Sequence, residues 1–241
     1  MPASNISLAP CQAADDDCDP EQLAVPAYLK DTYAWAYMWP AAVRFLDRPL
    51  VVSLILWGNY RRLLRAVLVE LRPGQRVYQP ASVYGDFSPQ VVRVLGPHGH
   101  LAVADIIPIQ VENSRRKLSA ASNASVHLHD AGERCNATYD VVCCFFLLHE
   151  MPMAYRHRTV DALLNAVEPG GKAVFVDYHK PHWAHPLKWT MNLVFNALEP
   201  FAKDLWFNEI ACYGSRSEEF VWSKQTYFGS LYQKVVAERR A

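Results

Sequence analysis

The chain has 241 residues with 24 basic and 24 acidic side chains, so its formal net charge is zero. This length fits one large domain, or a domain with an elaborated cap. A neutral chain lacks the basic excess that a general nucleic-acid-binding protein needs, and an apolar share of 51% excludes a wholly disordered chain. Glycine is scarce at 10 residues, about 4% against a usual share of roughly 7%. A nucleotide-binding chain of this composition has lost its glycine-rich loop or never had one.

The first part of the chain predicts a flexible leader followed by helices. Residues 1–22 are acidic and contain several prolines, which is typical of a mobile segment. Residues 23–73 predict a helical lid or membrane-contact segment, with helices over 28–46 and 49–71. Seven arginines between residues 44 and 76 favour contact with an anionic membrane surface, although a solvated helix face accounts for the charge equally well. No apolar stretch reaches the roughly 20 residues that a membrane span needs.

From residue 74 to residue 241, strands and helices alternate, which predicts a doubly wound α/β sheet. The apolar run at 139–146 is typical of a strand buried on both faces of a parallel sheet. The four residues Glu168-Pro169-Gly170-Gly171 predict the stop after a helix over 152–167. An aromatic, helical insertion is expected at 179–214. The other expected strands are 75–79, 100–105, 125–129 and 172–178, with a closing hairpin over 220–226 and 230–237.

Ligands of a doubly wound sheet bind beyond the carboxyl ends of its strands. Asp105 ends the second expected strand, where an acidic side chain accepts hydrogen bonds from ribose hydroxyls. Asp130 follows the third strand, where a carboxylate can meet a purine amino group. Each aspartate alone is more often a turn or cap residue. Both together, at matching strand ends, favour a nucleoside ligand.

Several segments in series resemble the class I S-adenosylmethionine (SAM) methyltransferases, and within them the branch that modifies ubiquinone and menaquinone. The segments are 77–85, 102–105, 139–142, 148–151, 168–172 and 227–234. This resemblance implies a Rossmann-like sheet of seven strands with an antiparallel last strand, and a bound SAM. It implies that SAM contacts Gln79, Ala81, Ser82, Tyr84, Gly85, Asp105, Ile106, Asp130 and Ala131.

The loop after the first strand departs from the pattern of that family. An acidic residue followed by three alternating glycines is usual there, whereas this chain has Gln79, Ala81 and Val83, and keeps only Gly85. Glycine permits positive φ and close approach of the backbone to a ligand, and a β-branched valine nearly excludes both. Gln79 cannot pair with the ammonium group of SAM. The variant loop resembles that of the rhodoquinone-biosynthesis proteins, which implies that SAM donates nitrogen in exchange for a ubiquinone methoxy group, with help from Mn(II).

Polar side chains at the ends of the fourth and fifth expected strands are the candidate catalytic and metal-binding residues. Glu150, Asp177, His149 and His179 are a plausible Mn(II) set, because that ion prefers oxygen ligands with some imidazole. Alternatively, the two histidines orient the substrate by hydrogen bonds, with His182 and His185 at the surface. Tyr78 flanks the variant loop and is a further catalytic candidate, or a packed aromatic residue.

The aromatic content favours a hydrophobic substrate such as a polyprenyl quinone. Tryptophans occur in both the N-terminal segment and the insertion, where they serve as a lid and interfacial anchor or as ordinary core. Six cysteines without a C-x-x-C motif fit a reducing cytoplasm, so we expect a cytoplasmic protein held peripherally at the inner membrane. An orthodox methyltransferase of a quinone or lipid-like phenol and a non-catalytic scaffold remain alternatives. A dinucleotide oxidoreductase is disfavoured because no G-x-G-x-x-G follows the first strand.

Overall fold

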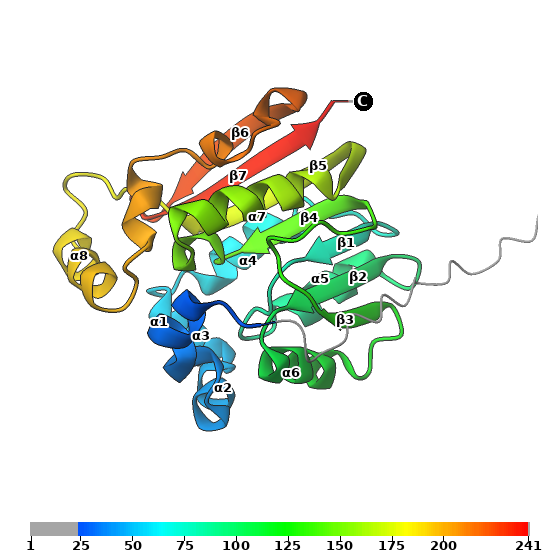
Figure 1. Ribbon diagram of the computed structural model, residues 1–241, viewed down its shortest axis with the longest axis horizontal. Coiled ribbons are helices and arrows are strands. Elements are labelled where there is room, and N and C mark those ends of the chain that lie inside the picture. The colour runs from blue at the N-terminus through cyan, green and yellow to red at the C-terminus, as the bar shows by residue number, and fades with distance from the viewer. Residues whose placement is uncertain (1–23, 241) are drawn as a thin grey trace, which may run out of the picture.

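Seven strands form a single mixed sheet in the computed structural model, which describes residues 24–240 (Figure 1). The strand order is β3-β2-β1-β4-β5-β7-β6. The first five strands run parallel, and β7 lies antiparallel between β5 and β6. The strands are β1 (Arg76–Gln79), β2 (His100–Asp105), β3 (Ala124–Leu128), β4 (Tyr139–Phe145), β5 (Val167–Tyr178), β6 (Phe220–Tyr227) and β7 (Tyr232–Arg239). The predicted seven-stranded α/β sheet with an antiparallel last strand is confirmed.

Both faces of the sheet are covered, which explains the unbroken apolar sequence of its central strands. Successive side chains of a strand point to opposite faces. Cys143 therefore packs with α4 (Tyr60–Leu68) and α5 (Phe87–Leu95), while Cys144 packs with α7 (Met153–Asn165) on the other side. The helix α6 (Pro108–Leu118) covers the β2–β3 edge. The two cysteines are buried core residues, as predicted.

The N-terminal segment differs from the two long helices that its sequence predicts. It forms three shorter helices ahead of α4: α1 (Ala27–Tyr37), α2 (Pro40–Leu46) and α3 (Pro49–Ile55). Pro40 and Pro49 each begin a helix, because a proline cannot continue the preceding helical hydrogen bonds. Positive φ at Trp57 and Gly58 ends α3. The expected leader, residues 1–22, lies outside the described residues.

The four residues that were expected to form a turn after α7 lie in a strand instead. Residues 168–171 belong to β5, which begins at Val167 and shifts register against β4 between Tyr139 and Val141. The insertion after β5 contains the helix α8 (Lys188–Ala197) and three short 3-10 helices, η2 (Ala202–Trp206), η3 (Ile210–Tyr213) and η4 (Ser217–Glu219). Another short turn, η1 (Leu148–Glu150), follows β4. Among the helices of residues 24–240, none has the length and apolarity that crossing a bilayer requires.

Candidate functional site

A cavity of about 420 Å³ lies at the carboxyl ends of the strands, between the sheet, the N-terminal helices and the insertion. This volume is within the range of small-molecule sites. Most of its wall is apolar, and its polar groups come from the strand ends, where ligands of such sheets bind. Of the expected SAM contacts, those that line the cavity are Ala81, Ser82, Tyr84, Asp105, Ile106, Asp130 and Ala131.

The side chain of Gln79 is occupied by the variant loop itself. Its Nε2 donates to the carbonyl of Ala81 at 2.7 Å, and its Oε1 accepts from the hydroxyl of Ser88 at 2.8 Å. Gln79 and Gly85 are not among the residues that line the cavity. Gly85 has φ of 84°, and a Cβ there would lie 2.9 Å from the Tyr60 hydroxyl oxygen, so the glycine that the loop retains is required by its backbone.

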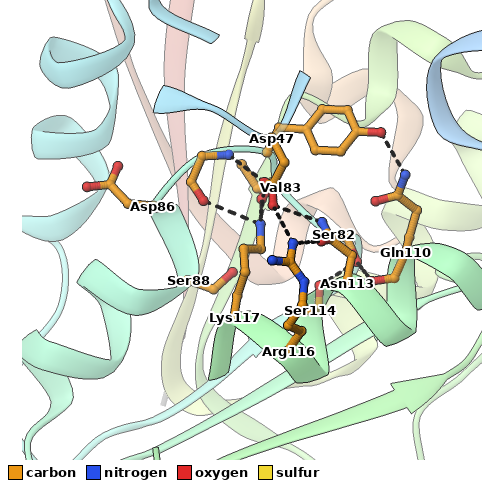
Figure 2. A network of polar contacts seen from close by, with 12 residues as sticks. Asp47, Ser82, Val83, Asp86, Ser88, Gln110, Asn113, Ser114, Arg116 and Lys117 are labelled. Carbon is orange, nitrogen blue, oxygen red and sulfur yellow. Dashed lines mark hydrogen bonds and ion pairs between the residues drawn. The ribbon is translucent and has the colours of Figure 1, made fainter. Parts of the chain in front are cut away.

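The loop is held from behind by a buried ion pair between the N-terminal segment and α6 (Figure 2). Lys117 Nζ lies 2.8 Å from Asp47 Oδ1 and donates to the carbonyls of Val83 at 2.7 Å and Gly85 at 3.3 Å. The Gly85 amide donates to the same Asp47 oxygen at 2.9 Å. The residue that follows α2 thereby fixes the backbone of the variant loop.

The two aspartates at the strand ends both line the cavity, and the ribose and adenine contacts expected of them stay predictions. Asp105 accepts the backbone amides of Ser82 at 2.8 Å and Ile107 at 2.9 Å, and its burial raises its pKa to about 6. It remains ionised at neutral pH, with lone pairs left for ribose hydroxyls. Asp130 accepts from the Gly132 amide and from Arg158 on its outer side.

His149 stands at the floor of the cavity, held by η1. Its Nδ1 lies 2.9 Å from Asp177 Oδ1, while its Nε2 lies 3.9 Å from Glu150 Oε1 and 3.8 Å from Glu199 Oε2. Burial by itself lowers the pKa of His149, but Asp177, then Glu199 and Glu150, raise it to about 9. Burial raises the pKa of Glu150 to about 8 against the lowering effect of His149, and burial likewise raises that of Glu199.

Three members of this cluster come from the segments expected to form a lid, and they were not among the predicted site residues. Glu199 follows α8, and Tyr33 of α1 donates to its Oε2 at 2.8 Å. Tyr37, one turn further along α1, donates a short hydrogen bond to Glu150 Oε1. Tyr33 and Tyr37 are four residues apart, so the sequence places them on one face of a helix. That spacing was the signal available, but it does not indicate that the two hydroxyls bond carboxylates.

Arg156, which is completely buried on α7, joins the cluster to the insertion. Its guanidinium donates to the carbonyls of Leu148 at 2.9 Å, Met151 at 2.8 Å and Phe201 at 2.9 Å. It also reaches Asp204 at 3.2 Å and the Tyr213 hydroxyl at 3.1 Å. These contacts fix η1 and the segment after Glu199 relative to each other. Nothing in the sequence pattern marks Arg156 as a site residue.

The remaining expected site residues do not join the cluster. Tyr78 stacks on Tyr139 on the opposite side of β1 from the α4–α5 core and is not among the cavity-lining residues. His179 contacts the Ser230 carbonyl at 3.0 Å, away from His149. His185 is buried against the Phe228 carbonyl, so the expectation that it is a surface residue is wrong, whereas His182 is exposed.

The expected Mn(II) ligands therefore do not converge in this structure. Asp177 faces the Nδ1 side of His149, its Oδ2 accepts backbone amides of η1, and His179 is engaged elsewhere. Within residues 24–240, no group of three or more His, Cys, Asp or Glu side chains is arranged to hold a metal ion. The residues proposed for Mn(II) do not fit that role as they stand.

No protein-family model matches the chain. Part of the chain is similar to ubiquinone/menaquinone biosynthesis C-methyltransferases UbiE. Identity to the Ectopseudomonas mendocina protein is 27% over 135 residues, covering 53% of this chain and 52% of the relative. Identity to the Stutzerimonas stutzeri protein is 28% over 132 residues, covering 52% and 51%. The chain is a distant homologue of these methyltransferases, and it spans about half the length of the curated relatives it matches.

Solved structures extend the similarity to most of the chain, and at these identities they establish the fold. An O-methyltransferase family protein from Burkholderia thailandensis has a TM-score of 0.65 at 14% identity, covering 86% of this chain and 64% of that one. A SAM-dependent methyltransferase from Aquifex aeolicus has a TM-score of 0.53 at 17% identity, covering 83% and 97%. The chain has the class I methyltransferase fold.

Proposed function

We propose that this protein is a SAM-using enzyme that replaces a methoxy group of ubiquinone by an amino group, the step that makes rhodoquinone. One observation carries the proposal: a single cavity joins the variant loop and the two strand-end aspartates to an apolar chamber that ends on His149. The homology to quinone C-methyltransferases supports a quinone as the acceptor. The loss of the acidic anchor at Gln79 supports a different use of SAM.

The donor half of the cavity suits the nucleoside part of SAM. Asp105 offers carboxylate lone pairs to the ribose, and Asp130 offers them to the adenine amino group. Ala81 and Ser82 line the intervening wall. SAM, when bound, supplies either an α-amino nitrogen or a sulfonium methyl group to the acceptor.

The acceptor half suits a quinone ring with an apolar tail. Its wall includes Ile55 and Trp57 at the end of α3 and Val194 and Leu198 around α8. At neutral pH the His149 imidazolium is placed to donate a hydrogen bond to a quinone oxygen, where negative charge develops when an amine adds to the ring. The adding amine loses a proton to a neighbouring carboxylate, and the methoxy group leaves as methanol after taking up a proton. The donor Cα then loses its proton and the quinone takes up the electron pair, and water hydrolyses the resulting imine. The donor leaves as its 2-oxo acid and the acceptor as the amino-hydroquinone.

Product mass tests this proposal directly. The protein is incubated with ubiquinone and SAM labelled with nitrogen-15 at the α-amino group, with Mn(II) present in one arm and omitted in another. Exchange of methoxy for labelled amino lowers the mass of the quinone and carries the label into it. Nitrogen from free ammonia, with SAM unconsumed, would overturn the proposal. The metal-free arm tests the expected help from Mn(II), for which the structure offers no ready site.

An orthodox methyl transfer to a quinone or lipid-like phenol is the second candidate, favoured by the homology to C-methyltransferases. In the same incubation it raises the product mass and leaves no nitrogen label. A scaffold without catalysis gives no product and binds no SAM. Amination, methyl transfer and a non-catalytic scaffold therefore predict a lower product mass, a higher product mass and no product, respectively.

We further propose that the protein docks peripherally on an anionic bilayer through a docking face made by α3, α8 and their flanks. The two helices lie at the same end of the molecule, and the Trp57 indole donates to Met191 Sδ at 3.3 Å, which joins them (Figure 1). Large apolar side chains are strongly exposed there, above all Leu50 (80%), Leu54 (77%) and Trp189 (83%). Such exposure marks interaction sites, and Arg44 and Arg48 beside it complement anionic lipids.

Vesicle sedimentation tests the docking face. Wild type should sediment with vesicles of phosphatidylcholine and phosphatidylglycerol, and less with phosphatidylcholine alone. The double substitution Leu54→Glu and Trp189→Glu should abolish sedimentation. Val221→Glu, which alters an exposed apolar side chain on the edge strand β6, should leave it unchanged. Equal sedimentation of the double variant, or dimerisation through this face in the absence of lipid, would contradict the docking proposal.

A further inference from the structure

The cluster at the cavity floor holds more negative groups than positive ones. Asp177, Glu150 and Glu199 surround the single imidazole of His149, and no lysine or arginine contact to these carboxylates occurs within residues 24–240. Each of the two glutamates accepts one tyrosine hydroxyl, which leaves further lone pairs on both. Both glutamates line the cavity. With no cation beside it, Glu150 has a pKa of about 8 and holds a proton at neutral pH, whereas a bound cation would favour its ionised form.

His149 gives a second, independent sign of a missing partner. Its side chain is buried, with 5% exposed, and its Nδ1 is held by Asp177 Oδ1 at 2.9 Å. Its Nε2 points between Glu150 and Glu199, and 3.8–3.9 Å is too long for a hydrogen bond to either. Buried polar groups are almost always bonded, so Nε2 leaves a place beside the two glutamates for a ligand that offers it a hydrogen-bond acceptor.

The cluster lies beside the loop that lost its acidic anchor. Tyr37, which bonds Glu150, stacks on Tyr84 of the variant loop with 5.8 Å between ring centroids. The Tyr84 hydroxyl in turn donates to the Ala36 carbonyl at 2.7 Å. Asp105, Tyr84, Glu150 and Glu199 all line the same cavity, so a ligand bound at Asp105 shares that cavity with the two glutamates.

We propose that Glu150 and Glu199 bind the α-ammonium group of the donor and replace the anchor that Gln79 no longer provides. This inference rests on the proposed use of SAM. The two carboxylates come from separate segments, the β4 end and the insertion, so the group they hold lies on the side of His149 rather than within the variant loop. An ammonium held there stands next to the acceptor half of the cavity.

The chemistry of the site selects an ammonium over the other cation that SAM carries. A sulfonium has no N–H or O–H donor, whereas an ammonium has three donors and can bond two carboxylates at once. Charge-assisted bonds of this kind are the strong ones, and burial in an apolar cavity strengthens them further.

Two ligands that differ by one amino group test the inference. Binding of S-adenosylhomocysteine is compared by calorimetry with binding of an analogue in which hydrogen replaces its α-amino group. Wild type should bind the amino compound on the order of tenfold more tightly, or better. Glu199→Gln and Glu150→Gln, which keep the side-chain shape, should lose most of that preference while binding the deaminated analogue as wild type does. Glu209→Gln, an exposed glutamate of the same insertion paired with Lys224, is the matched control and should keep the full preference.

The outcomes separate this inference from the proposed function. Equal binding of both ligands by wild type, or an undiminished preference in both glutamine variants, overturns the ammonium site. Absence of binding of either ligand overturns the site and the use of SAM together. The protein could prefer the amino ligand as expected and yet methylate its quinone. That result would support the ammonium site and reject amination. Tight Mn(II) binding, followed by electron paramagnetic resonance and lost in Glu199→Gln, would assign the cluster to a metal and overturn the inference.

Discussion

The two ends of the cavity are built in opposite ways. The variant loop is a local structure: Gln79 bonds within it, and one buried lysine, Lys117, fixes its backbone from behind. The His149 cluster is assembled from distant segments, since α1, η1 and the insertion each contribute a member. The polar side chains of the loop are bonded, Ser82 to Ser114 and Tyr84 to the Ala36 carbonyl, whereas the Nε2 of His149 has no partner within hydrogen-bond distance in the described part of the chain. The comparison teaches that the loop is a fixed wall of the cavity, whereas the cluster leaves polar atoms available to a ligand.

The largest effect should follow from removing Arg156, on which the cluster side depends. Arg156→Met leaves three carbonyl groups and Asp204 without their donor, so we expect the free energy of unfolding to fall by about 3–5 kcal/mol. Urea denaturation measures this loss. Arg93→Met, on the exposed side of α5, should change stability by no more than about 0.5 kcal/mol. A loss below about 1 kcal/mol for Arg156→Met would show that the insertion does not depend on this brace.

At the variant loop, the two basic side chains beside Asp47 should contribute very different amounts to the free energy of unfolding. Lys117 lies 2.8 Å from Asp47 with a side chain 11% exposed, and Arg116 lies 3.7 Å away with a side chain 66% exposed. Lys117→Met should cost about 3 kcal/mol of unfolding free energy and weaken donor binding, because Asp47 and two loop carbonyls lose a buried partner. Arg116→Met should cost less than about 1 kcal/mol. Similar losses in the two variants would contradict the bracing role of Lys117.

A smaller effect should follow from restoring the acid in the variant loop. Gln79→Glu sets a carboxylate against the Ala81 carbonyl in place of an N–H donor, so stability should fall by about 1–3 kcal/mol. Gln75→Glu is the control, because the Gln75 Oε1 is an acceptor for the Arg72 amide and glutamate retains that role. Thermal and urea denaturation of both variants measure the difference. A stabilised Gln79→Glu protein would show that the loop still accommodates the acidic anchor.

The pH dependence of stability is a test that needs no substitution, and above pH 6.5 it reports chiefly on the titrating groups of the cluster. The folded-state pKa values of His149, about 9, and Glu150, about 8, both lie above their ordinary values of 6.5 and 4.5. The folded protein therefore holds more protons than the unfolded chain between pH 6.5 and 8, so stability should decline as the pH rises through this window. The decline should continue to pH 9 through His149. Urea denaturation at several pH values should show a shallower decline in Glu150→Gln and an unchanged one in Glu209→Gln.

Much of the scaffold was predictable because its signals are local. Alternating apolar runs and turns predicted the strands, and His100–Asp105 was predicted to the residue. Asp105 and Asp130 were placed at the cavity by their position after strands alone. The N-terminal helices were predicted too long, because the helical spacing of apolar residues was given more weight than the prolines. In the structure, Pro40 and Pro49 each begin a new helix.

The functional cluster was predictable only in part. His149, Glu150 and Asp177 follow parallel strands, whose ends meet at one edge of the sheet, and this topology brings them together. Glu199, Tyr33 and Arg156 lie on helices or loops whose packing partners are far away in sequence, so no periodicity relates them to the site. His179 was misplaced for the converse reason: it follows β5, but its ring turns toward Ser230 of the β6–β7 turn.

The sequence by itself determined the sheet and the strand-end positions of Asp105 and Asp130, and it shows Gln79 where an acidic residue was expected, because strand patterning and loop residues act over a few neighbours. Only the tertiary structure decided that two glutamates and two tyrosines from separate segments gather around His149. Such a gathering depends on how α1 and the insertion pack over the sheet, and that packing is fixed by long-range burial and by the contacts of one buried arginine.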